Sequence, residues 1–137
     1  MTIAAIHGYI IGFAIMGSWP IIGFWALALR TRSYEETPTF WRVVSIAQIL
    51  LGVQLLVGLV LLVLYAVGRG GLPGDGSAFQ VTFHVLYGMV FPLIVLAVAH
   101  RGARDGRLNP YTAFAVVGLV NFGLTARAWM VGAGFGG

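Results

Sequence analysis

Four long apolar segments are the feature that most constrains what this chain can fold into. They run from about Ile3 to Leu29, from Val43 to Val67, from Phe79 to Ala99 and from Tyr111 to Val131. Each is long enough to cross a bilayer as a helix, which takes about 20 residues. The sequence therefore predicts an all-α integral membrane protein whose first partner is the lipid bilayer.

Composition supports the same class and excludes several others. Of the 137 residues 59% are hydrophobic and 9% are charged, whereas a soluble domain is about 25% charged. The length leaves room for one domain, spanning residues 1–137. There is no cysteine, which excludes disulfides and thiolate metal sites. The net charge of +4 comes from arginines in short loops, so we expect no nucleic-acid partner.

The loops predict how the helices are connected and oriented. Short connectors favour an antiparallel four-helix bundle. Of the eight arginines, six fall in the first and third loops, and the positive-inside rule assigns these loops to the cytoplasm. Both termini then lie outside, in a bacterial-type plasma membrane. The six arginines of the first and third loops are Arg30, Arg32, Arg42, Arg101, Arg104 and Arg107.

We expect the first segment to remain as an uncleaved helix, because it is too long for a signal peptide and has no positive n-region.

Polar and small residues within the apolar segments indicate how the helices pack. A polar group at mid-membrane is costly unless it is hydrogen-bonded, so four such residues should face the bundle interior. Gly8 and Gly12 form a GxxxG pair, a spacing that lets helices approach closely. Asn109 is placed to cap a helix that begins at Pro110. The four polar residues are Gln48, Gln54, Asn121 and Thr125.

Ionisable residues occur at matched depth near the outer side. His7 lies four residues into the first helix, or roughly 6 Å at 1.5 Å per residue, and His84 lies five residues into the third. Arg127 lies four residues before the outer end of the fourth. Tyr87 and Gly88 follow His84 by about one turn. Intramembrane ionisable groups usually face the interior and mark function, so these residues form our candidate site.

Haem b is a group that meets the demands of this set. Histidines on the first and third helices are diagonal partners, and their imidazoles could ligate the iron of a flat group held between them. Gly88 would let a ring lie against the backbone, and Arg127 could bind a propionate. A quinone headgroup held by His84, Tyr87 and Arg127 is a related alternative.

The segments "HGYIIG" and "FHVLYG" place histidines on alternate helices of a four-helix unit. In this the chain resembles small membrane b-type cytochromes and one half of a haem A synthase. The resemblance implies that His7 and His84 are the axial ligands of haem iron. It departs from the haem A synthase pattern, because there is no second full set of histidines and no cysteine pair.

Three functions therefore remain open. The first is a haem-binding electron-transfer subunit or small cytochrome. The second is a non-catalytic accessory subunit of a larger respiratory or photosynthetic complex, associated with other membrane subunits or with itself. The third is a small transporter or channel, which ranks last because all four acidic residues lie in loops. Whether the chain is an enzyme is left open. The acidic residues are Glu35, Glu36, Asp75 and Asp105.

Overall fold

The computed structural model describes residues 2–32, 37–71 and 76–135, and every element in these ranges is helical. Four helices are long and apolar enough to cross a membrane, as the sequence predicts. Of the four acidic residues, Glu35, Glu36 and Asp75 lie outside the described ranges. In chain order the elements are α1 (Ile3–Ala5), η1 (Ile6–Ile11), α2 (Gly12–Thr31), α3 (Pro38–Ala66), α4 (Ala78–Val85), η2 (Leu86–Val90), α5 (Phe91–Arg104) and α6 (Pro110–Gly132).

Some helix ends extend beyond the apolar segments. The second helix begins at Pro38 rather than near residue 43, and the third ends at Arg104 rather than near residue 99. Hydropathy marks where the apolar residues of a segment end. The hydrogen-bonded helix continues beyond that point into the flanking polar residues. The predicted cap is confirmed: Asn109 Oδ1 accepts hydrogen bonds from the backbone N–H of Tyr111, at 3.0 Å, and of Thr112, at 3.3 Å.

Two of the four spanning helices contain a stretch of π-helix. One is η1, which includes His7, and the other is η2, which begins two residues after His84. A π-turn adds one residue to the helical repeat, so it changes which side chains face a neighbouring helix, and such turns are frequent at functional sites. Both candidate ligands are thus in or beside an irregular turn.

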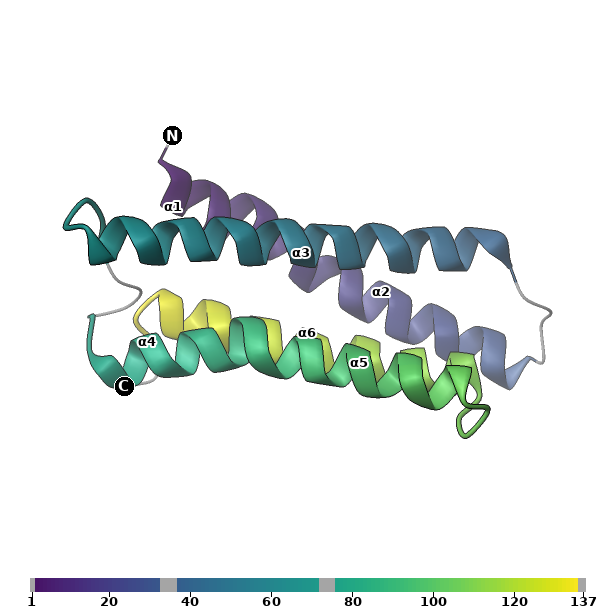
Figure 1. Cartoon of the computed structure of the whole chain (residues 1–137). Coiled ribbons are helices and arrows are strands. Elements are labelled where there is room, and N and C mark those ends of the chain that lie inside the picture. Colours follow the sequence, from purple (N-terminus) through teal and green to yellow (C-terminus); the bar gives the residue numbers. More distant parts are fainter. Residues whose placement is uncertain (1, 33–36, 72–75, 136–137) are drawn as a thin grey trace.

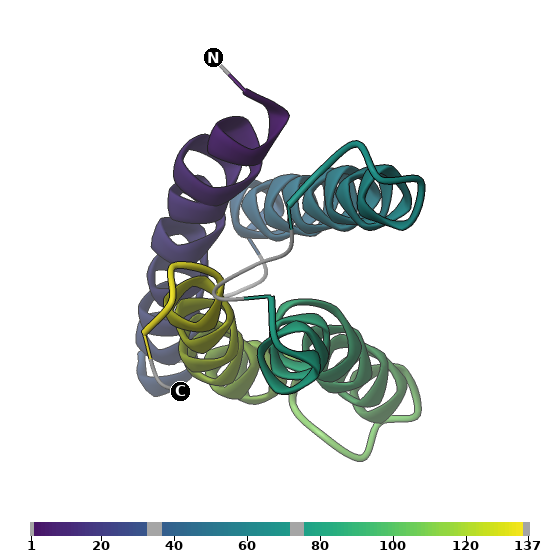
Figure 2. The same ribbon diagram turned by 90° about the vertical axis from the view of Figure 1, so that its left-hand side faces the viewer.

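The helices form an open arrangement rather than a closed ring (Figures 1 and 2). The first span packs along α6, which also packs against α4, η2 and α5. Within the described residues, the contacts of α3 are chiefly with α1, η1 and α2. Figure 1 shows the start of α1, the end of α3, the start of α4 and the end of α6 at one end of the molecule. The ends of α2 and α5 and the starts of α3 and α6 lie at the opposite end.

Helices α2 and α6 cross closely at two glycines. A Cβ added to Gly118 would lie 2.6 Å from the carbonyl oxygen of Trp19 and would also clash with the backbone of Gly23. In the GxxxG pair of the first helix, a Cβ added to Gly8 would meet nothing within 4 Å, and one added to Gly12 would meet the side chains of Trp129 and Gln54 only at 3.8 and 3.9 Å. Packing in lipid depends on close approach, and here Gly23 and Gly118 provide it.

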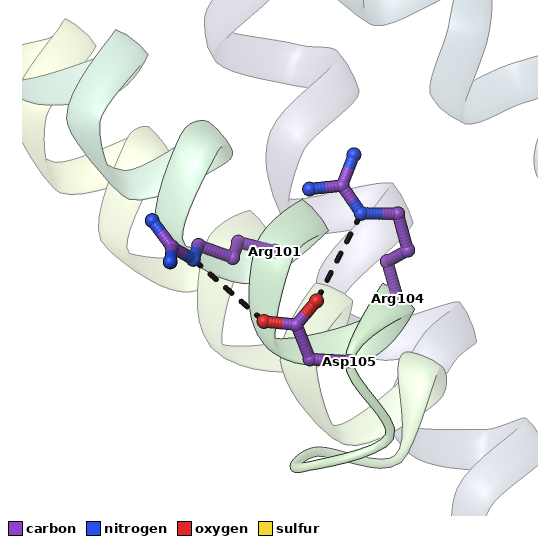
Figure 3. A network of polar contacts seen from close by, with 3 residues as sticks. All are labelled: Arg101, Arg104 and Asp105. Carbon is purple, nitrogen blue, oxygen red and sulfur yellow. Dashed lines mark ion pairs between the residues drawn. The ribbon is translucent and has the colours of Figure 1, made fainter.

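The arginine-rich end carries exposed charges and polar links between helices, one of which is the hydrogen bond of 3.2 Å that Arg30 Nε donates to Thr112 Oγ1. Asp105 lies between Arg101 and Arg104, with N–O distances of 3.6 and 3.9 Å (Figure 3). Such exposed pairs contribute little stability. Gln48 of α3 and His100 of α5 are joined by a hydrogen bond of 2.7 Å between their Nε2 atoms. That bond connects two helices that otherwise make few contacts.

Candidate cofactor site between His7 and His84

A cavity of about 330 Å³ lies among all four spanning helices. On α3 its lining extends from Leu51 to Leu62, a rise of about 16 Å at 1.5 Å per residue. Most lining residues are apolar, and His7, His84, Gln54 and Thr125 supply polar groups. A mainly apolar pocket with a few convergent polar groups is typical of small-molecule and cofactor sites.

The imidazoles of His7 and His84 lie side by side in this cavity. Their ring centroids are 6.1 Å apart, and the ring planes are inclined at 58°. An ion bound by one nitrogen of each ring at about 2 Å would separate the centroids by about 6 Å. The spacing therefore suits a single metal centre between the two rings.

His84 is held in one orientation by α6. Its Nδ1 lies 2.9 Å from the carbonyl oxygen of Ala128. Because a carbonyl oxygen only accepts hydrogen bonds, Nδ1 carries a proton, and in the neutral ring Nε2 then keeps its lone pair. Ligating histidines typically donate their second ring N–H to a carbonyl or carboxylate in this way. The ring also lies against Gly132, where an added Cβ would be 2.9 Å from Cε1.

His7 is seated on α3 in a similar manner. A Cβ added to Gly58 would lie 3.2 Å from the Cε1 atom of His7. One turn earlier on α3, Gln54 Nε2 donates a hydrogen bond of 3.0 Å to the backbone carbonyl of His7. Each histidine therefore packs on a glycine of another helix, His7 on Gly58 and His84 on Gly132.

The other sequence-predicted site residues are placed differently. Gly88 lines the cavity, and a Cβ added there would be in ordinary contact, 3.4 Å, with the Cβ of Ala128. Tyr87 does not line it; its ring packs between Phe83 and Phe91, with centroids 5.7 and 5.6 Å away. The structure thus brings His7, His84 and Gly88 together at the cavity and leaves Tyr87 outside it.

Arg127 is half-buried but does not line the cavity. Thr125 lines the cavity and lies two residues earlier on α6. At about 100° of rotation per residue, the side chain of Arg127 lies about 200° around the helix from that of Thr125. The outer-layer depth that sequence reasoning assigned to Arg127 is compatible with its position on α6, but its side of the helix differs from that of the cavity.

Sequence reasoning did not identify Gly58, Gly132 and the Ala128 carbonyl as partners of the histidines. Gly58 and Gly132 were detectable only as small residues, and a backbone acceptor leaves no signal in side-chain chemistry. Among the described residues, no group of three or more His, Cys, Asp or Glu could hold a metal ion. Among these residue types the cavity thus offers a metal two ligands, His7 and His84, and a cofactor such as a porphyrin is one source of the others.

Comparisons of the chain with protein-family models, with curated proteins and with solved structures found no match. Its function must therefore be inferred from the cavity and its lining. Two imidazoles, a mainly apolar wall and few other polar groups can bind a flat, largely apolar group by its metal or by its ring edges.

Proposed function

We propose that this chain is a membrane electron-transfer protein that binds haem b between His7 and His84. The observation that carries the proposal is the pair of imidazoles, 6.1 Å apart within an apolar cavity. We further propose an antiparallel bundle with both termini outside, which places the cavity in the outer leaflet of the plasma membrane. Bound haem would supply one-electron exchange between ferric and ferrous iron.

The donor set fits this group. Nε2 of His84 keeps its lone pair because Nδ1 donates to Ala128, and neutral imidazole is the form that ligates iron. Aliphatic side chains including Leu55, Leu59 and Val85 line the cavity and suit the apolar faces of a porphyrin. A cavity of about 330 Å³ falls at the lower end of the range for small-molecule sites, roughly 300–1,000 Å³.

The residues of the chain would bind, orient and shield the group. His7 and His84, from different helices, would hold the group, and the chemistry it would supply is electron transfer rather than reaction at an open iron site. Apolar walls exclude water, and the polarity around a haem is one of the factors that set its reduction potential. The proposal assigns Tyr87 and Arg127 no role inside the cavity.

Optical spectroscopy on the purified protein tests the proposal. We expect a Soret band and a reduced-minus-oxidised haem b spectrum, with both lost in His7→Ala and in His84→Ala. His100→Ala is the matched control and should keep the spectrum, because His100 pairs with Gln48 at the opposite end of the bundle. If protein from haem-replete cells has no haem band and takes up none when haemin is added, the proposal is wrong.

A second candidate is an accessory subunit, and the exposure of α3 favours it. Apolar side chains of α3 that include Ile46, Ile49, Leu56 and Val63 are exposed within the chain. Lipid can cover them, and so can another membrane subunit or a second copy of this chain. Co-purification of stoichiometric partners in mild detergent, together with no chromophore in the isolated chain, would favour this function over the first.

A further inference from the structure

The cavity contains two buried polar atoms whose hydrogen-bonding capacity is not used. His7 Nδ1 and Gln54 Oε1 have no hydrogen-bond partner among the described residues, although both residues line the cavity. A polar atom left in this state in an apolar interior is costly. A buried polar atom without a partner needs a specific explanation. Here the two atoms belong to residues that are already hydrogen-bonded to each other through the backbone of His7.

The backbone of His7 determines how the Gln54 amide is oriented. The carbonyl oxygen of His7 accepts a hydrogen bond of 3.0 Å from Gln54 Nε2. Only the NH₂ group of the amide can donate to a carbonyl, so an exchanged amide would bring two oxygens together. Gln54 Oε1 therefore acts only as an acceptor. A hydrogen bond between Oε1 and Nδ1 of His7 requires that Nδ1 carries the proton.

The two atoms come from side chains that already meet. Gln54 and Gly58 are one turn apart on the same face of α3. The backbone of His7 is bonded to Gln54, and its ring lies over Gly58, where an added Cβ would be 3.2 Å from Cε1. The ring is thus held beside the residue whose amide bonds its backbone, and a hydrogen bond between Nδ1 and Oε1 would form by rotation about the side-chain bonds.

We propose that Gln54 is the positioning residue for His7, with Oε1 accepting a hydrogen bond from Nδ1–H. This bond selects the tautomer in which Nε2 keeps its lone pair and faces the cavity. Both histidines would then share one arrangement, since the Nδ1 of His84 donates to the Ala128 carbonyl. The consequence for iron binding rests on the proposed haem function, whereas the hydrogen bond itself does not.

The first test uses protein without haem. In ¹⁵N-histidine-labelled protein at alkaline pH, where imidazole is neutral, His7 should be in the Nδ1–H tautomer. Gln54→Met, which keeps an unbranched chain without an acceptor, should give a mixture of tautomers. Gln54→Glu should restore the Nδ1–H form. The matched control is Gln48→Met on the same helix, which should alter His100 and leave His7 unchanged.

The second test uses haem-loaded protein. Removing the partner of a ligating histidine typically weakens metal binding by about 10- to 100-fold, so we expect that loss of haem affinity in Gln54→Met. The reduction potential should rise, because an imidazole without an acceptor donates less charge to ferric iron. Gln54→Glu should keep the affinity and lower the potential.

The outcomes separate this inference from the proposed function. If the tautomer of His7 depends on Gln54 but no haem binds, the hydrogen bond stands and the haem function fails. If haem binds and Gln54→Met changes neither the tautomer nor the affinity and potential, the inference fails and the haem function stands. An Nε2–H tautomer of His7 in the unaltered protein would also overturn the inference. Should Gln54→Met fold poorly, Gln54→Asn withdraws the same amide from His7 and tests the same bond.

Discussion

The ring of His84 rests directly on the backbone of Gly132. A Cβ added to Gly132 would lie 2.9 Å from Cε1 of His84 and 3.0 Å from Nδ1, and Nδ1 is the atom that Ala128 holds at 2.9 Å. Ala128 and Gly132 are one turn apart on α6, so this helix both supports the ring and fixes its proton. The ring of His84 is therefore aligned by two residues whose side chains carry no polar group.

Replacing Gly132 with alanine should displace this ring. The new methyl group would be closer to His84 than carbon atoms pack, and overpacking of this kind costs about 1–3 kcal/mol. We expect Gly132→Ala to lose most of its bound haem, measured as Soret absorbance per protein. Gly123→Ala on the same helix is the control, because its methyl group would meet nothing within 4 Å. Haem binding equal to that of the unaltered protein would contradict the role given to Gly132.

The same substitution at Gly58 should have a smaller effect. There the added Cβ would be 3.2 Å from Cε1 of His7, so the ring must move by only a few tenths of an ångström. We expect haem affinity to decrease in the order unaltered protein, Gly58→Ala, Gly132→Ala in a haemin titration. Gly52→Ala on α3 meets nothing within 4 Å and should titrate like the unaltered protein. A larger loss at Gly58 than at Gly132 would contradict this order.

Hydropathy was enough to predict the helical class and the four spans. Apolar segments of this length have few structural alternatives in lipid, and the observed helices begin and end within about five residues of the predicted limits. The sequence also predicted that His7 and His84 lie at a similar depth. This prediction required only counting residues from the helix ends and assuming that consecutive helices alternate in direction.

The details of the site could not be predicted in this way. A constant rise per residue does not foresee η1 or η2, and these π-turns change which side chains face the cavity. Arg127 and Tyr87 were assigned by depth, but lining a cavity also requires the correct side of the helix. The Nδ1–H group of His84 donates to the backbone carbonyl of Ala128. Every residue has such a carbonyl, so the residue type at position 128 does not indicate this contact.

Single-cysteine labelling can test the proposed topology directly, because the chain has no native cysteine. Gly71 and Leu108 are both exposed; Gly71 follows α3 and Leu108 follows α5 in the chain, and these two helices end at opposite ends of the bundle (Figure 1). We expect a membrane-impermeant maleimide to label Gly71→Cys in intact cells, and to label Leu108→Cys only after permeabilisation. The reverse pattern would contradict the orientation inferred from the arginines.

Asn121 provides a test of the energetic cost of an unused polar group. Its side chain is fully buried, and both amide atoms lack a hydrogen-bond partner among the described residues. Leucine has the same branching and the same number of side-chain heavy atoms, so Asn121→Leu should raise the free energy of unfolding by about 1–3 kcal/mol. Because Asn121 does not line the cavity, haem affinity should not change. Destabilisation in a detergent unfolding titration would instead indicate that the amide is hydrogen-bonded in the membrane.

Gly118 should be the glycine least tolerant of substitution. An added Cβ would lie 2.6 Å from the carbonyl oxygen of Trp19 and would also clash with the backbone of Gly23. Backbone atoms cannot rotate aside as the ring of His84 can, so α2 and α6 would have to separate along their whole crossing. We expect Gly118→Ala to decrease the free energy of unfolding by about 3 kcal/mol or more. Its thermal unfolding midpoint should therefore fall further than that of Gly132→Ala.

Gly123→Ala is the control for this prediction. It adds the same methyl group to α6 at an open position, where better helix propensity should stabilise the protein by up to about 1 kcal/mol. Equal midpoints for the Gly118 and Gly123 variants would show that the two helices do not cross this closely.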